Sequence, residues 1–202
     1  MNTATLDTPA GPFTAVTDDD GAVLASGWTA DAGALVALIH PDLRGDGTVR
    51  PRADLGPATA AARAYHEGDL DAVADVLVVQ RSGAFLTHAW DVLRTVAPGE
   101  PVTYTDLAAL AGRPAAVLAA ASACARNAAA LFVPCHRVVR TDGGLGGFRW
   151  GTGVKEWLLA HESAQPRGPA SQPQPSIMAV AMSSSAAMPS SRQRSASSRA
   201  PA

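Results

Sequence analysis

Apolar and polar positions alternate in two short stretches near the beginning of the chain. Residues 13–17 and 22–28 favour strands, and the Asp-Asp-Asp-Gly sequence at 18–21 has the composition of a turn, so we predict a β-hairpin. Apolar residues then recur at helical spacing at 32–40 and at 57–67. These elements predict a small unit of mixed α and β structure in the first part of the chain.

A second pattern of helices follows in the middle of the chain. Residues 85–96 carry apolar side chains at helical spacing, and Thr103 with Asp106 has the sequence of a capping box, which predicts the start of another helix. A glycine then allows a turn, and Pro114 suits the first turn of a further helix that runs to about residue 126. Helix, short turn and helix is the helix-turn-helix pattern. The second helix is mostly alanine, so its slim surface suits close approach to DNA or to another helix.

The last part of the chain changes in composition. A glycine-dense loop at 141–153 precedes a predicted helix at 155–162, whose buried face we expect to consist of Trp157, Leu158 and Leu159. Beyond this helix the chain is rich in Ser, Pro, Ala, Gln and Arg. Such a segment buries too little apolar surface to offset its ordering entropy, so we predict that it is disordered.

The order of these elements predicts an α+β fold class. We expect a small N-terminal α/β domain at 1–80, and then a mainly helical domain at 81–162 that contains the helix-turn-helix. A disordered tail at 163–202 completes the predicted organisation.

The net charge of −2 hides an uneven distribution. Residues 1–80 carry 4 basic and 12 acidic side chains, residues 81–162 carry 8 and 6, and residues 163–202 carry 4 and none. A nucleic-acid partner would therefore meet the second half of the chain. No apolar run is long enough for a membrane span and the start does not resemble a signal peptide, so we expect a cytoplasmic protein.

The chain has two cysteines, and one of them is the strongest candidate for chemistry. Cys124 and Cys135 are too far apart in sequence for a CxxC pair, and no metal-ligand cluster is visible, so we expect no metal. Cys135 precedes His136 and Arg137, and a neighbouring imidazole and guanidinium would lower the pKa of a reactive thiol. A buried structural cysteine is the common alternative, and a Cys-His pair also suits a cysteine hydrolase. Glu162 either orients His136 in a Cys-His-Glu relay or lies at a solvated helix end.

The cysteine motif and three other segments, in the same order, resemble the O6-alkylguanine-DNA alkyltransferase family. The similarity covers residues 82–162 and lies in the segments 104–112, 126–127, 134–138 and 155–162. It implies direct reversal of DNA damage without a cofactor, in which a guanine is turned out of the duplex and its O6-alkyl group passes irreversibly to the protein. The implied partner of a monomeric protein is double-stranded DNA that carries O6-alkylguanine, met in the minor groove. O4-alkylthymine stays open as a second substrate.

The resemblance also assigns roles by matched position. Cys135 would accept the alkyl group, and His136 would take the thiol proton through a water while Glu162 polarises the imidazole. Tyr104 would help to protonate N3 of the leaving guanine, and Asn127 would organise the site.

Further contacts with the substrate and the DNA are implied at seven positions. The backbone carbonyl of Val138, together with that of the cysteine, would read the exocyclic amine. The full set of expected substrate and DNA contacts is Leu118, Val138, Arg137, Arg149, Trp150, Ala115 and Arg126.

Two positions depart from the family pattern. Leu118 stands where the family typically has an arginine that fills the gap left by the flipped base, which predicts weaker DNA binding or slower flipping. Trp150 stands at the pocket lip, which predicts faster transfer of methyl than of bulky groups. Leu118 leaves open an alternative function, a protein that binds alkylated bases with weak or no transfer. A helix-turn-helix regulator with an incidental cysteine is a third interpretation.

Overall fold

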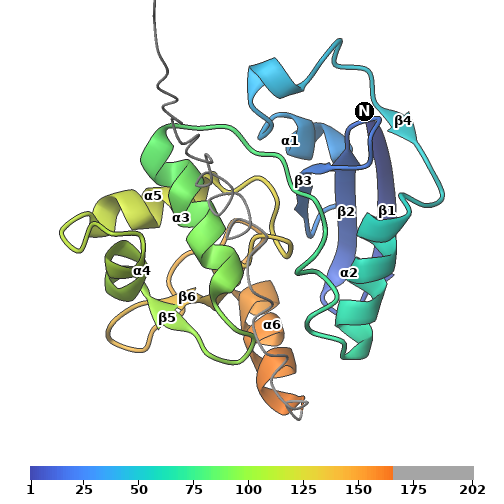
Figure 1. The fold of residues 1–202 in the computed structure, drawn as a ribbon. Coiled ribbons are helices and arrows are strands. Elements are labelled where there is room, and N and C mark those ends of the chain that lie inside the picture. Colours follow the sequence, from blue (N-terminus) through green and yellow to red (C-terminus); the bar gives the residue numbers. More distant parts are fainter. Residues whose placement is uncertain (166–202) are drawn as a thin grey trace, which may run out of the picture. The chain divides into compact units, whose positions relative to one another are not determined.

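A computed structural model describes residues 1–165 of the chain (Figure 1). The described residues form one compact unit. The architecture is α+β, as predicted, with an N-terminal sheet and a mainly helical second part. The division at residue 80 stays a prediction, and residues 166–202 of the predicted tail lie outside the described residues.

A four-stranded sheet forms the first part of the unit, and it contains the predicted hairpin. The strand order is β3-β2-β1-β4, in which β1, β2 and β3 are antiparallel neighbours and β4 runs parallel to β1. Sequence reasoning missed the first strand, in which Thr and Asn occupy positions that a stronger pattern would fill with Val or Ile. The strands are β1 Asn2–Thr8, β2 Gly11–Thr17, β3 Val23–Gly27 and β4 Arg50–Pro51.

Two helices accompany this sheet. Helix α1, Ala32–Val36, is shorter than predicted, because the N–H groups of Leu38 and Ile39 bond to carbonyls three rather than four residues before them. Helix α2, Pro57–Glu67, has the predicted bounds. Its first residue is a proline, which lacks only an N–H that would be unpaired anyway, and Gly68 ends it with a left-handed backbone at φ 112°.

The second part is built from helices and two short parallel strands. The capping box at Thr103 and Asp106 is present: the Thr103 side chain accepts from the Asp106 N–H at 3.1 Å, and Asp106 accepts from the Thr103 N–H at 2.9 Å. The elements are α3 Ala84–Thr95, β5 Val102–Thr103, α4 Tyr104–Leu110, α5 Val117–Arg126, β6 Val138–Val139 and α6 Thr152–Ala164.

Two predictions for these helices were wrong. Helix α5 begins at Val117 rather than at Pro114, because a turn closed by the Ala116 N–H and the Arg113 carbonyl comes first. Of the predicted buried face of α6, Leu158 is fully buried as expected, but Trp157 and Leu159 are only partly covered, and the other buried residues are Lys155 and Glu162. Helix α6 therefore presents two charged side chains to the interior.

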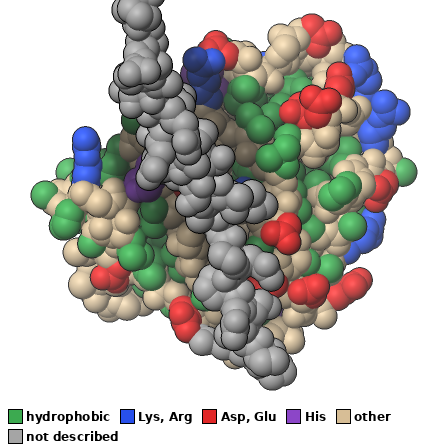
Figure 2. Space-filling model, in the orientation of Figure 1, with side chains coloured by type: hydrophobic (Ala, Val, Ile, Leu, Met, Phe, Trp, Pro, Cys, Tyr) green, Lys and Arg blue, Asp and Glu red, His purple; other side chains and the backbone are tan. Residues whose placement is uncertain are grey.

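Hydrogen bonds join the sheet to the segment that leads to the cysteine motif. Ser26, in β3, donates through its N–H to the Ala128 carbonyl at 2.8 Å and through its hydroxyl to the Ala130 carbonyl at 2.7 Å. The sheet therefore holds the chain a few residues before Cys135. On the face drawn in Figure 2, most acidic side chains lie over the N-terminal part, in keeping with its net charge. Within residues 1–165, no helix is both long and apolar enough to cross a membrane.

Candidate active site

Cys135 begins a one-turn 3-10 helix, Cys135–Arg137, that follows the buried segment 128–133. Its side chain is largely covered, with 8% of the residue exposed, and Sγ accepts a hydrogen bond from Asn127 Nδ2 at 3.1 Å. Burial raises the pKa of the Cys135 thiol. The expected lowering of this pKa was wrong, because the side chains of His136 and Arg137 bond to a carboxylate instead of to the sulfur.

Asn127 is held in one orientation by partners on both sides of its amide. Nδ2 also donates to the Val133 carbonyl at 2.7 Å, and Oδ1 accepts from the Ala129 N–H at 3.1 Å and from Gln80 Nε2 at 3.0 Å. Sequence reasoning missed Gln80, which lies 47 residues away in sequence. Gln80 follows an apolar run and belongs to no motif, so the sequence carries no signal of its role.

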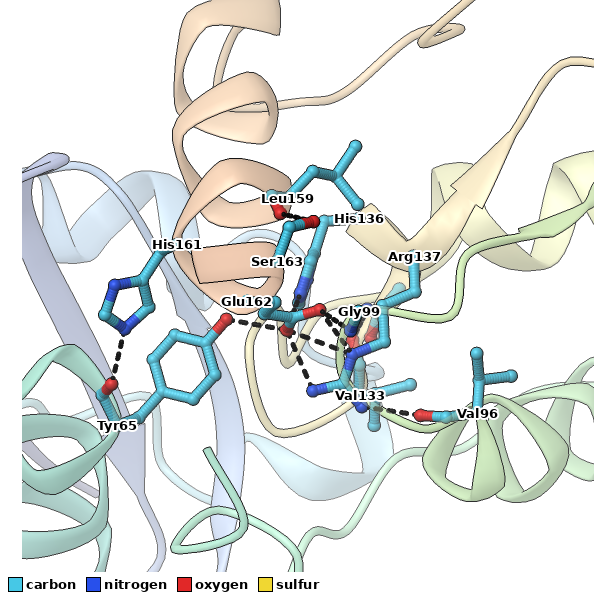
Figure 3. A network of polar contacts seen from close by, with 11 residues as sticks. Tyr65, Val96, Gly99, Val133, His136, Arg137, Leu159, His161, Glu162 and Ser163 are labelled. Atoms are coloured by element: carbon cyan, nitrogen blue, oxygen red, sulfur yellow. Dashed lines mark hydrogen bonds and ion pairs between the residues drawn. The ribbon is translucent and has the colours of Figure 1, made fainter. Parts of the chain in front are cut away.

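A buried network of polar contacts surrounds Glu162, as Figure 3 shows. Oε1 of Glu162 lies 2.8 Å from His136 Nε2, 2.9 Å from Arg137 Nη2 and 2.7 Å from the Tyr65 hydroxyl. Oε2 accepts from the Gly99 N–H at 3.1 Å. The structure thus brings His136 and Glu162 together as the sequence analysis predicted, and it adds three donors that were not foreseen: Arg137, Tyr65 and the Gly99 N–H.

The charges in this network fix the protonation of the imidazole. Burial would raise the pKa of Glu162, but the hydrogen bonds from His136 and Arg137 and the charge of Arg137 outweigh it and hold that pKa well below its usual range. Burial lowers the pKa of His136 more than the bond to Glu162 raises it. An ionised carboxylate only accepts, so Nε2 of a neutral His136 carries the proton. Nδ1 then carries a lone pair that can accept a proton. It is buried without a hydrogen-bond partner within residues 1–165.

Arg137 and Val138 are placed differently from what was expected of DNA or substrate contacts. The Arg137 guanidinium is buried against Glu162, and Nη1 donates to the Val96 carbonyl at 2.6 Å, so it cannot reach DNA in this structure. The Val138 carbonyl accepts from Lys155 Nζ at 2.5 Å, and Val138 lies in strand β6 rather than in the wall of the cavity described below.

Lys155 is a functional candidate that sequence reasoning missed. Its side chain is fully buried, and the ammonium donates to the backbone carbonyls of Val138 and Leu145. Burial lowers the pKa of Lys155. Its helical spacing from Leu158 and Glu162 was a signal in the sequence, but a lysine is rarely assigned to a buried face. Lys155 fastens the glycine-dense loop to the strand that follows the cysteine motif.

A cavity of about 460 Å³ opens in front of the cysteine, a volume that suits a small ligand. Tyr104, the half-buried first residue of α4, lines it, and burial raises the pKa of its phenol. Gly146 approaches this phenol so closely that a Cβ there would lie 3.0 Å from the Tyr104 hydroxyl. The wall consists of Tyr104, Ala121, Cys124, Ala125, Asn127, Ala130, Cys135, Gly147, Phe148, Arg149 and Trp150.

The other predicted residues lie at the rim or on the outer surface. Trp150 lines the cavity and packs so tightly on Gly27 that a Cβ on this glycine would overlap the indole. Arg149 also lines it, and its guanidinium donates to the Ala125 carbonyl at 2.7 Å. Leu118 is 89% exposed. It precedes Ala121 and Ala125 of the cavity wall by three and seven residues, so it lies on the same face of α5 as these two alanines. Two further predicted contacts are exposed at either end of α5, namely Ala115 and Arg126.

Comparisons with known proteins agree on one family. Residues 84–164 match the family model described as the DNA binding domain of 6-O-methylguanine DNA methyltransferase. Methylated-DNA–protein-cysteine methyltransferase of Shigella flexneri is 34% identical over 159 residues, which are 78% of this chain and 92% of the relative. The bifunctional transcriptional activator/DNA repair enzyme Ada of Escherichia coli K12 is 52% identical over 83 residues, and the match spans 41% of this chain but only 23% of Ada. The crystal structure of Mycobacterium tuberculosis OGT in complex with DNA aligns with a TM-score of 0.65 at 25% identity, covering 82% of this chain and 96% of that one.

Proposed function

Since the chain belongs to the O6-methylguanine-DNA methyltransferase family, we propose that it repairs alkylated DNA by direct reversal. Cys135 accepts the alkyl group of an O6-alkylguanine, and each molecule acts once because the thioether is not regenerated. The observation that carries this proposal is that Cys135 and Tyr104 line the same cavity, while the residue after the cysteine, His136, is bonded to the buried Glu162.

The first step is removal of the thiol proton. The raised pKa of Cys135 keeps the sulfur protonated and unreactive at rest. The proton passes through a water to Nδ1 of His136, the buried lone pair that lacks a protein partner within the described residues. The ionised Glu162 then stabilises the imidazolium through Nε2. The nucleophile therefore forms only by transfer of the thiol proton to His136.

The second step is transfer of the alkyl group. The thiolate attacks the alkyl carbon, so a C–S bond forms while the C–O6 bond breaks and its electrons return to the guanine. Tyr104 gives its proton to N3 of the leaving base and later recovers one from His136. The net result is one alkyl group moved to sulfur and one proton moved from sulfur to guanine.

Helix α5 is the surface that would meet the duplex. It presents mainly alanines, and its exposed Leu118 lies on the face that continues into the cavity wall. A leucine can wedge apolar surface between bases, but it cannot donate a hydrogen bond to the orphaned partner base. This one observation favours the second candidate, a protein that binds alkylated bases with weak or no transfer.

Mass spectrometry separates the two candidates. The full chain is incubated with an O6-methylguanine duplex, and the expected product carries one methyl group on the peptide that contains Cys135. Cys135→Ala should abolish the adduct, whereas the matched control Cys124→Ala, at the other cysteine of the cavity wall, should retain it. Retained binding of the alkylated duplex without any adduct would favour the second candidate.

A further inference from the structure

We propose that Tyr65, supplied by the N-terminal part of the chain, is a positioning residue for alkyl transfer. Its hydroxyl steadies the Glu162 carboxylate and limits how strongly this carboxylate attracts a proton to His136. The segment that matches the family model begins at residue 84, so Tyr65 lies outside it. The inference rests on the proposed function and extends it to a residue of helix α2.

Tyr65 is held firmly where it meets Glu162. It is fully buried in the last turn of α2, and its hydroxyl donates to Glu162 Oε1 at 2.7 Å across 97 residues of sequence. Its backbone carbonyl lies 2.8 Å from Nε2 of His161, and the two rings pack with centroids 5.5 Å apart. Figure 3 shows the phenol pointing at the carboxylate from the side opposite Arg137. The contact is therefore part of the fold, with both ends fixed.

Tyr65 and His136 compete for the same oxygen. Oε1 accepts from the Tyr65 hydroxyl at 2.7 Å, and it lies 2.8 Å from His136 Nε2 and 2.9 Å from Arg137 Nη2. Each donor takes a share of the negative charge that the carboxylate offers. Without the phenol, more of that charge acts on His136, and the imidazolium becomes more stable.

The remaining groups around His136 set the direction of this effect. Glu162 raises the pKa of His136, while Arg137 beside it and Lys155 from α6 lower it. A neutral His136 is required before transfer, since only a free Nδ1 can accept the thiol proton. Burial and Glu162 both raise the pKa of Tyr65, so the phenol stays a donor throughout the pH range of an assay. Tyr65 therefore helps to keep the base of the relay unprotonated at rest.

The test compares two variants of the full chain. Tyr65→Phe removes only the hydroxyl, and the matched control Thr59→Val removes another buried hydroxyl of α2, which bonds to Asp54 rather than to Glu162. Single-turnover transfer from free O6-benzylguanine is measured against pH, and the His136 imidazole is titrated by NMR. In Tyr65→Phe the acidic limb of the pH–rate profile and the midpoint of the His136 titration should both shift to higher pH, by about 0.5 pH unit or more. In Thr59→Val neither should move.

The outcomes separate this inference from the proposed function. The role of Tyr65 would be overturned if, in a folded Tyr65→Phe protein, the acidic limb of the rate profile and the His136 titration midpoint stayed at the same pH or shifted to lower pH. Absence of transfer by the unmodified chain would overturn the proposed function, while the NMR titration would still decide the role of Tyr65.

A second variant covers failure of Tyr65→Phe to fold. The chain has two tyrosines, so fluorotyrosine incorporated into a Tyr104→Phe background replaces Tyr65 alone. Because the more acidic phenol donates a stronger hydrogen bond to Glu162, the midpoint of the His136 titration should shift to lower pH. An unmoved titration there would equally refute the inference.

Discussion

Replacing Leu118 by arginine should speed transfer on duplex DNA and leave transfer from a free base unchanged. Leu118 is 89% exposed, so the substitution should change the free energy of unfolding by less than about 0.5 kcal/mol. The arginine would add a charge-assisted hydrogen bond of about 1.5–3 kcal/mol, against a rotamer cost of up to about 2 kcal/mol. The balance of roughly 1 kcal/mol corresponds to a rate constant about five-fold higher.

The assay measures second-order rate constants on an O6-methylguanine duplex and on free O6-benzylguanine, at two salt concentrations. If the arginine contacts a phosphate, the log–log dependence of the duplex rate on salt should steepen by about 0.9. Leu118→Gln is the matched control, because it adds a long polar side chain without charge.

Three results would refute this reasoning. No gain on the duplex would mean that a cation at this point of α5 does not meet the DNA. An equal gain on duplex and free base would place the effect in the cavity, and an equal gain from Leu118→Gln would show that charge is irrelevant.

Three further predictions follow from the buried contacts. Gln80→Leu leaves the Asn127 amide without one donor, so urea unfolding should show a loss of about 1–3 kcal/mol, and iodoacetamide labelling of the active-site thiol should change. Glu162→Gln leaves the Arg137 guanidinium buried without its counter-charge, which should cost about 3–5 kcal/mol of stability in the same measurement. Because the pKa of Glu162 is lowered in the folded protein, its stabilisation is present above the unfolded value of about 4.3 and is lost as pH falls; the difference between wild type and Glu162→Gln should therefore shrink in acid. Trp150→Ala should raise the benzyl-to-methyl ratio of transfer rates, whereas an unchanged ratio would show that the indole does not limit the cavity.

Features governed by local sequence were predictable. The capping box needs only Thr103 and Asp106, and both its hydrogen bonds are present. The bounds of α2 follow from a proline at its start and Gly68 at its end. The juxtaposition of His136 and Glu162 was expected from the family resemblance, which supplied what spacing alone could not.

Side-chain directions and long-range contacts were not predictable. Successive residues of a 3-10 helix point about 120° apart, so adjacency in sequence did not place His136 or Arg137 against the sulfur of Cys135. Tyr65 and Gln80 reach the site only because the sheet and helix α2 pack against the second part of the chain. Neither carries a local pattern, since their partners lie 97 and 47 residues away in sequence.

The position of Glu162 near the end of α6 bears on the time at which a newly made chain becomes reactive. His136 precedes Glu162 by 26 residues, which a ribosome adds in roughly 1–5 s at its usual pace. Until then the thiol of Cys135 has no polarised base, and the network around the carboxylate cannot close. We therefore expect nascent chains that have not yet gained Glu162 to be inert toward alkylated bases, so that an acceptor usable only once is not consumed while the site is incomplete.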